Sequence, residues 1–307
     1  MHATAHLVER HYGHAGLLDR ILDALRAAGK DPAHLAAGDL APVDEFHIRG
    51  REATVELVQR AQPQPGERVL DIGCGLGGSA RHLAAEHRCR VSAIDLTPAY
   101  VDLARELARR VGLAGDVDYR VADALALPFD DATFDLVWTE HVQMNVEDKH
   151  RFYAEIARVL RPRGRLALHD FLRGPAGEPH YPVPWAADAS TSFVVSPQGL
   201  QQAVEAAGLR VVDWDDRTRI STDWLAERMT QPVPPPLGVH LLMGADAKAK
   251  FANVLTGLGV GRGERVAVVL PVDMAVPPAP AAMAPTPATP AAVYIITRRR
   301  RRPNWSP

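Results

Sequence analysis

The segment DIGCGLGG, residues 71–78, decides the fold of this chain. It follows a short apolar run that is typical of a strand and precedes a run that is typical of a helix. Gly73, Gly75 and Gly78 at such a junction allow a tight turn and the close approach of a nucleotide-like ligand to the helix N-terminus. The segment therefore predicts the first strand, turn and helix of a nucleotide-binding α/β fold.

The same glycines also match the dinucleotide-binding fingerprint, which is a common pattern. Asp71 separates the two classes of ligand. A carboxylate at this position would face a pyrophosphate, and like charges repel. It suits a ligand that carries positive charge there, and S-adenosylmethionine has a sulfonium and an ammonium group and no phosphate. The sequence favours S-adenosylmethionine, with an NAD-linked oxidoreductase as the alternative.

Further strand-like runs follow, and several of them end in polar residues. Asp95 ends the second run and is followed by Leu96, at about 20 residues beyond the glycines, where a ribose diol is usually held. Asp123 and Ala124 end the third run, where an adenine amino group can be bound. Glu140 follows the fourth run. These positions predict a nucleoside site along one edge of a parallel sheet.

Five motifs in this order resemble the class I S-adenosylmethionine-dependent methyltransferases, over roughly residues 45–217. The resemblance implies an α/β fold with a Rossmann-like, doubly wound, seven-stranded sheet whose last strand is antiparallel, and with helical N-terminal and inserted cap elements. It implies S-adenosyl-L-methionine as cofactor. The implied cofactor-binding residues are Asp71, Gly73, Gly75, Asp95, Leu96, Asp123, Ala124, Glu140, Phe46 and His47.

The composition excludes several classes of protein. The formal net charge of −2 includes +4 from residues 271–307, which hold five arginines and one aspartate, so residues 1–270 carry −6. This balance argues against nucleic acid as a partner and leaves a small-molecule substrate. The two cysteines are too few for a disulfide framework or a cysteine-rich zinc site, and we expect no metal site. The first residues have no signal-peptide core, so we expect a cytoplasmic protein without a membrane span.

The pattern of the chain predicts three regions. Residues 1–62 read as an N-terminal helical lid, with amphipathic helices at 16–26 and 51–61. Residues 63–270 read as the methyltransferase domain, with substrate-cap insertions near 171–195 and 218–258 and a last strand at 264–270. Residues 271–307 are rich in proline and alanine and end in arginines, which predicts a disordered tail.

Methyl transfer needs a positioned acceptor, exclusion of water and removal of a proton, so it demands no nucleophilic residue. His141 follows Glu140 at the sheet edge and is a candidate general base, because its ordinary pKa lies near neutrality. Packing or a hydrogen bond to the cofactor is the alternative role. Gln143 and Asn145 are candidates for substrate contact, or else for capping the next helix.

Aromatic residues outside the sheet complete the predicted site. Phe46 and His47 precede the first strand and are expected to close over the cofactor. Tyr12 is a second candidate catalytic residue, with its hydroxyl presented to the substrate. Tyr181 and Trp185 lie in a proline-rich loop and are candidates for a pocket wall that binds an amine.

Within the superfamily, the stretches DEFHIRG, residues 44–50, and QMNV, residues 143–146, resemble the sarcosine and dimethylglycine N-methyltransferase group. Arg49 departs from that group, which tends to have glycine there. The resemblance implies a small-molecule methyltransferase that acts on an amine of the glycine or sarcosine type. The alternatives are O-, S- or C-methylation of a small metabolite, and a cofactor-binding protein without turnover. The oligomeric state stays open.

Overall fold

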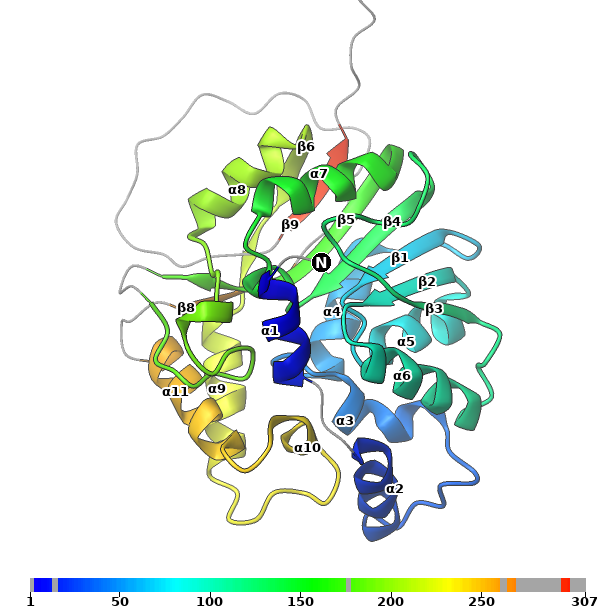
Figure 1. Ribbon diagram of the computed structural model, residues 1–307, viewed down its shortest axis with the longest axis vertical. Helices are drawn as coiled ribbons and strands as arrows, with labels where there is room; N and C mark the ends of the chain where they lie inside the picture. The colour runs from blue at the N-terminus through cyan, green and yellow to red at the C-terminus, as the bar shows by residue number, and fades with distance from the viewer. Residues whose placement is uncertain (1–2, 13–15, 175–177, 260–263, 269–293, 299–307) are drawn as a thin grey trace, which may run out of the picture.

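The centre of the molecule is a sheet of parallel strands. The structure, a computed structural model, describes residues 3–12, 16–174, 178–259, 264–268 and 294–298. The parallel strands lie in the spatial order 3-2-1-4-5 and pair in register with one another. They are β1 (Arg68–Ile72), β2 (Arg90–Asp95), β3 (Val117–Val121), β4 (Phe134–Glu140) and β5 (Leu160–Arg173). This topology confirms the Rossmann-like α/β fold (Figure 1).

Amphipathic helices cover both faces of the sheet. They are α5 (Gly78–His87), α6 (Pro98–Arg110), α7 (Lys149–Val159) and α8 (Pro197–Ala206). Figure 1 shows α5 and α6 on one side of the sheet and α7 and α8 on the other. The apolar residues of α6 recur at intervals of three and four and are buried, from Tyr100 to Ala108. The Ser196 side chain caps α8 by accepting a hydrogen bond from the backbone N–H of Gly199, as a helix start requires.

Two groups of helices lie outside this sheet. The N-terminal group is α1 (Ala3–Tyr12), α2 (Leu17–Ala27), α3 (Ala41–Asp44) and α4 (Arg51–Ala61), and the later group is α9 (Thr218–Met229), α10 (His240–Met243) and α11 (Ala247–Gly259). The helices predicted at 16–26 and 51–61 are confirmed as α2 and α4, whereas α1 was not predicted. Within the described ranges, no helix combines the length and apolar character that crossing a bilayer requires.

The antiparallel part of the sheet differs from the prediction. The described residues form nine strands. The segment 264–270 was predicted to be the last strand of the sheet. It does contain a strand, β8 (Glu264–Val268), but β8 pairs with the end of β5 at residues 170–173 and with the short β7 (Asp215–Asp216). Residues 269 and 270 lie outside the described residues.

The antiparallel strand within the main sheet comes instead from the predicted tail. β9 (Tyr294–Arg298) lies between β5 and β6 (Leu209–Asp213) and pairs antiparallel with both. The prediction of a disordered tail over 271–307 is therefore wrong for residues 294–298. Its other residues lie outside the described part of the chain. The prediction failed because prolines and alanines upstream dominate the composition, while the strand itself is a short β-branched run.

A buried ion pair joins the N-terminal helices to the sheet domain. The Arg81 guanidinium on α5 donates to the carboxylate of Asp44 at the end of α3, and both side chains are 1% exposed. Arg81 also donates to the backbone oxygen of Leu76. Gly78 permits this close approach, since a Cβ there would lie 2.6 Å from the backbone oxygen of Asp44. The first turn of α5 and the end of α3 are therefore packed backbone to backbone.

Removing the Asp44 carboxylate is expected to destabilise the protein. The Asp44→Ala variant leaves the Arg81 charge buried without its anion, which typically costs about 3–5 kcal/mol. Urea denaturation followed by circular dichroism measures the loss. The matched control is Asp23→Ala, because Asp23 pairs with Arg26 at the surface, where both side chains are more than half exposed. Equal stability of the two variants would contradict this account.

Candidate functional site

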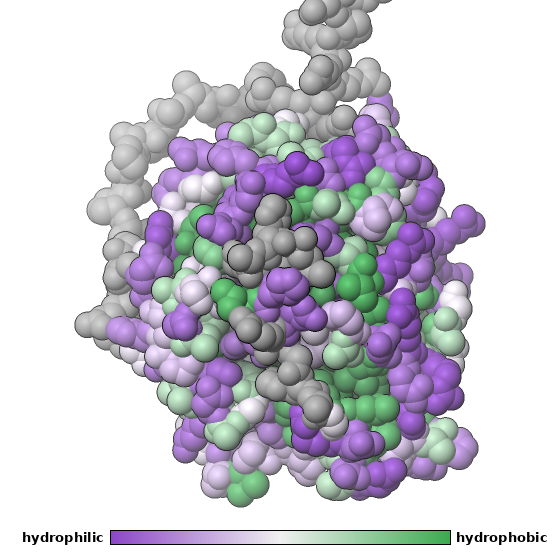
Figure 2. Space-filling model, viewed as in Figure 1, coloured by the Kyte–Doolittle hydropathy of each residue, from purple (hydrophilic) through white to green (hydrophobic). Residues whose placement is uncertain are grey.

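A cavity of about 730 Å³ lies at the carboxyl ends of the central strands. Residues from β1, β2 and β4 form its floor, and Val8 and Tyr12 of α1 line it from the opposite side. Figure 2 shows apolar surface on both sides of α1 on this face of the molecule. Ligands of open α/β sheets bind at this edge, so the cavity is the candidate site.

The glycine turn shapes one wall of the cavity. The backbone N–H groups of Gly73 and Cys74 donate to the carbonyl of Ile94, which ties the turn to β2. Gly73 has a φ of 72°, and a Cβ there would lie 2.3 Å from Cγ2 of Val142. Glycine is therefore required at this position, where the turn after β1 packs against the loop after β4.

Asp71 lies just before the glycine turn, and its surroundings indicate whether the site fits S-adenosylmethionine. Asp71 is buried, and its Oδ2 has no hydrogen-bond partner among the described residues. Burial, together with Glu140 and Asp95, raises the pKa of Asp71 well above its ordinary value. An acceptor in this position requires a donor or a cation, and the ammonium group of S-adenosylmethionine supplies both. The residues therefore fit this cofactor.

Asp95 organises the backbone as well as facing the cavity. Its two carboxylate oxygens accept hydrogen bonds from the backbone N–H groups of Gly75 (2.9 Å) and Thr97 (2.8 Å). Burial raises the pKa of Asp95, although these hydrogen bonds oppose the shift. Each oxygen keeps a second lone pair, so a ribose hydroxyl can still bind.

Most of the residues predicted from the sequence lie together around this cavity. Its lining includes Tyr12, Phe46, His47, Asp71, Gly73, Gly75, Asp95, Leu96, Asp123, Ala124, Glu140, His141, Asn145 and Trp185. Their roles stay predictions, but their positions are consistent with one site.

Gln143 and Tyr181 do not belong to the lining. Gln143 is fully buried and donates from Nε2 to the backbone oxygen of Phe171. Tyr181 packs against a neighbouring apolar cluster that includes Val183 and Trp185. Neither position supports the predicted substrate contact. Sequence order placed Gln143 at the sheet edge, but the short 3-10 turn Gln143–Asn145 directs its side chain into the protein.

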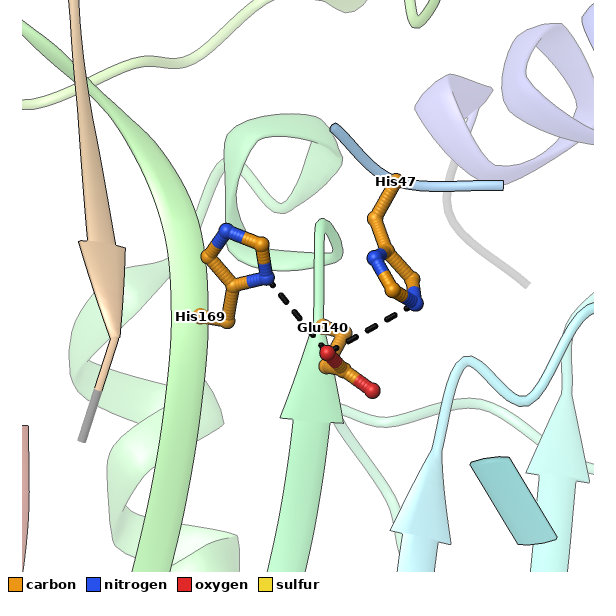
Figure 3. A group of neighbouring side chains, drawn as sticks. All are labelled: His47, Glu140 and His169. Atoms are coloured by element: carbon orange, nitrogen blue, oxygen red, sulfur yellow. Dashed lines mark hydrogen bonds and ion pairs between the residues drawn. The ribbon is translucent and has the colours of Figure 1, made fainter. Parts of the chain in front are cut away.

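Glu140 is the centre of a network of buried polar groups (Figure 3). Its Oε2 accepts hydrogen bonds from the hydroxyl of Ser79 (2.6 Å) and the indole N–H of Trp138 (2.9 Å). Its Oε1 lies 3.6 Å from Nε2 of His47 and 3.4 Å from Nδ1 of His169. Ser79 and His169 were not predicted as site residues, although His169 stands near the end of β5, the same sheet edge.

The pKa of His47 is raised in this network. Burial alone would lower its pKa, but the carboxylates of Glu140 and Glu45 outweigh burial and raise the pKa of His47 to about 9. Glu45 lies 3.0 Å from Nε2 of His47 and also pairs with Arg51. Glu45 and Arg51 were not predicted as site residues.

The pKa of His141 is shifted in the opposite direction. Burial, followed by the charges of His169 and His47, lowers the pKa of His141 well below its ordinary value. Its Nε2 has no hydrogen-bond partner in the described part of the chain. Its φ of 54° places the backbone in the left-handed region, where its N–H donates to the backbone oxygen of His169. A neutral imidazole beside the cavity can accept a proton.

Two buried ionisable residues, Asp170 and Lys149, hydrogen-bond to the backbone of the loop that carries His141. Asp170 accepts hydrogen bonds from the backbone N–H groups of Val142 and Gln143. The Lys149 ammonium donates to the backbone oxygens of Gln143 and Phe193. Burial raises the pKa of Asp170 to about 7 and lowers that of Lys149 to about 7. Asp170 thus binds N–H groups of this loop, and Lys149 binds one of its carbonyl groups.

Tyr12 and Asn145 both line the cavity and are hydrogen-bonded to each other. The Tyr12 hydroxyl donates to Oδ1 of Asn145 (2.9 Å), and the Asn145 amide donates to the backbone oxygens of Trp185 (2.9 Å) and Thr191 (2.8 Å). Trp185 stacks on Phe171 with ring centroids 4.7 Å apart. Asn145 therefore fastens α1 to the proline-rich loop, and it does not cap a helix.

Comparisons with known proteins agree with this fold. Residues 70–168 match the family model described as "Methyltransferase domain". The chain is 35% identical over 172 residues to the O-methyltransferase cnsE of Penicillium expansum, an alignment that covers 55% of this chain and 61% of that protein. The chain spans 56–61% of the length of two curated relatives, cnsE among them.

Solved structures share the fold. The geranyl diphosphate C-methyltransferase of Streptomyces coelicolor A3(2) has a TM-score of 0.64 at 20% identity, covering 86% of this chain and 96% of that one. A protein of Galdieria sulphuraria named for sarcosine and dimethylglycine methylation has a TM-score of 0.54 at 18% identity, covering 81% and 95%. Residues 70–168 therefore match a methyltransferase domain, and the solved structures show that the chain shares the fold of these methyltransferases.

Proposed function

We propose that the chain transfers a methyl group from S-adenosylmethionine to a hydroxyl group of a small molecule. The observation that carries the proposal is the position of His141, which lines the same cavity as Asp71 and Asp95 and whose Nε2 has no hydrogen-bond partner among the described residues. Small-molecule O-methyltransferases among the relatives support a hydroxyl acceptor.

The chain's own residues provide the cofactor half of the site. Asp71 would hold the ammonium group, Asp95 the ribose and Asp123 the adenine end. When bound, S-adenosylmethionine supplies an activated methyl group whose carbon–sulfur bond breaks, with its electron pair left on sulfur, as the bond to the acceptor oxygen forms. His141 would take the hydroxyl proton on Nε2, which is buried in this structure and would have to turn toward the acceptor. Phe46 and α1 exclude water from the cavity.

The charge of the cavity indicates which acceptors fit. Seven lining side chains are carboxylates, and Arg151 is the one lysine or arginine among the lining residues. An acceptor with a phosphate or diphosphate group would meet this negative charge, which Arg151 alone among the described lysines and arginines of the lining opposes. Apolar lining residues such as Val8, Met144 and Trp185 suit an uncharged ring or chain. The proposed acceptor is therefore a neutral hydroxyl compound without phosphate.

An amine acceptor is the second candidate, as the resemblance to the sarcosine and dimethylglycine group implies. The same negative charge favours it, since a protonated amine is attracted to the cavity. Trp185 lines the cavity, but its indole N–H donates to the Ser192 hydroxyl (3.0 Å) and its ring stacks on Phe171. These contacts leave less of the Trp185 side chain available to bind an amine.

A panel of acceptors tests the proposal. The full chain is incubated with S-adenosylmethionine and, separately, with phenols, aliphatic alcohols, amines and matched phosphate esters, and products heavier by one methyl group are detected by mass spectrometry. We expect methylation in the hydroxyl series and none in the phosphate esters. Methylation confined to the amines would favour the second candidate. Binding of the cofactor without S-adenosylhomocysteine formation across the panel would indicate a non-catalytic binder.

Replacing Asp95 is expected to weaken cofactor binding at least tenfold. A hydrogen bond to a charged group contributes about 1.5–3 kcal/mol, and Asp95→Ala also removes the acceptor of the Gly75 and Thr97 N–H groups. Calorimetric titration with S-adenosylhomocysteine measures the change. The Asp95→Asn variant is the matched control, because it keeps one carbonyl acceptor and should lose less. Unchanged affinity in Asp95→Ala would remove Asp95 from the site.

A further inference from the structure

Three side chains at the floor of the cavity come from segments far apart in the sequence. His47 precedes α4, Glu140 ends β4 and His169 lies on β5. One donor atom from each lies within 4.8 Å of the other two. The side chains are 5%, 4% and 0% exposed, so they are held by packing. Figure 3 shows both imidazole rings with a nitrogen directed at the Glu140 carboxylate.

The distances match those between ligands of one small cation. Bonds of about 2.0–2.2 Å from an ion to nitrogen and oxygen place neighbouring ligand atoms roughly 3–3.6 Å apart. Oε1 of Glu140 lies 3.6 Å from Nε2 of His47 and 3.4 Å from Nδ1 of His169. The donor atoms of His47 and His169 lie at most 4.8 Å apart, so an ion bound by all three atoms would draw the two imidazoles closer together.

The remaining oxygen of Glu140 is already oriented for this role. Oε2 accepts hydrogen bonds from Ser79 and Trp138, which fixes the carboxylate plane and leaves Oε1 toward the two imidazoles. Ligating carboxylates are typically held in this way by a second layer of donors. Nε2 of His47 also lies 3.0 Å from Oε2 of Glu45, so an ion would replace the proton between these two atoms, and the Glu45 carboxylate would add negative charge beside the ion.

We propose that His47, Glu140 and His169 bind a divalent first-row transition-metal ion at the floor of the cavity. Two imidazoles and one carboxylate suit Zn²⁺, Fe²⁺, Co²⁺ or Mn²⁺ better than Mg²⁺ or Ca²⁺, which prefer oxygen ligands throughout. Three protein ligands leave coordination positions open. His47 and Glu140 line the cavity and His169 does not, so the open positions face the cavity.

The ion would act on the acceptor oxygen. A hydroxyl group bound to a divalent cation loses its proton more readily, and the imidazole of His141 is close by, with its ring centroid 5.9 Å from that of His47 and 4.8 Å from that of His169. This consequence rests on the proposed hydroxyl methylation. The metal site itself does not, because metal binding is measured without turnover.

Titration of the full chain with Co²⁺ tests the site. The protein is stripped with a chelator, dialysed and titrated with CoCl₂ while the visible ligand-field absorption of protein-bound Co²⁺ is recorded, and Zn²⁺ is then added as a competitor. We expect one Co²⁺ per chain, displaced by Zn²⁺. His47→Gln and Glu140→Gln should each weaken Co²⁺ binding at least a hundredfold. The matched control is His82→Gln, a histidine whose Nδ1 contacts Arg51 outside the three-residue group.

The outcomes separate clearly. Absence of saturable Co²⁺ binding in the wild-type chain, or equal binding by the wild type and both variants, would overturn the proposal. Circular dichroism verifies that each variant is folded. If neither variant folds, X-ray absorption of Co²⁺ bound to the wild type decides, since two imidazoles and oxygen ligands support the site and any other ligand set contradicts it. Methylation without metal binding, or metal binding without methylation, distinguishes this proposal from the proposed function.

Discussion

Deleting residues 294–307 is expected to abolish cooperative folding, because the deletion removes β9 from between β5 and β6. Four residues of β5 and four of β6 are paired with β9. Buried backbone groups that lose their partners cost about 1–3 kcal/mol each, so the loss of several exceeds about 5 kcal/mol. The net stability of a domain is typically only about 5–15 kcal/mol. Circular dichroism melting and the yield of soluble protein measure the effect.

A shorter deletion is the control for this prediction. Removing residues 299–307 takes away most of the arginine run and leaves both ladders of β9 intact. We expect this variant to melt as the full chain does. If the longer deletion also melts like the full chain, β9 contributes nothing to the sheet, and the prediction of a dispensable tail from residue 271 onward would be right after all.

The sequence predicted the parallel half of the sheet well because its signals are local. The acid-glycine turn after β1 and the acid at the end of β2 each lie within a few residues of the element that they identify. β9 escaped prediction for the opposite reason. Its partners on β5 and β6 are more than 80 residues away, and the valine-containing segment 264–270 was the more obvious last strand.

The same distinction applies to the site. Asp71, Asp95 and Glu140 could be predicted from their places at strand ends, which meet at one edge of a parallel sheet. The partners of Glu140 could not, because His47 and His169 reach it from segments whose approach is set by tertiary packing. Gln143 follows the same strand end, but its side chain does not line the cavity. The backbone after β4 turns sharply at His141, so neighbouring side chains point in different directions.

Replacing His141 is expected to lower kcat at least about a hundredfold with the acceptor that the panel identifies. A positioned general base typically contributes about 10²–10⁴-fold. The informative variant is His141→Asn, because asparagine tolerates the left-handed backbone at this position and so separates the loss of the imidazole from backbone strain. Steady-state kinetics should show a fall in kcat, while calorimetry should show S-adenosylhomocysteine affinity within about threefold of the wild type.

A second variant distinguishes proton removal from orientation of the acceptor. His141→Gln keeps a side chain that hydrogen-bonds but cannot take a proton at neutral pH. If proton removal is the role, glutamine rescues little of the lost turnover. Near-native turnover in His141→Gln would instead mean that the imidazole only orients the acceptor. The hydroxyl proton would then have to leave by another route, and the ion proposed at His47, Glu140 and His169 would become the stronger candidate for activating the acceptor, because a bound cation lowers the pKa of the hydroxyl without an imidazole base.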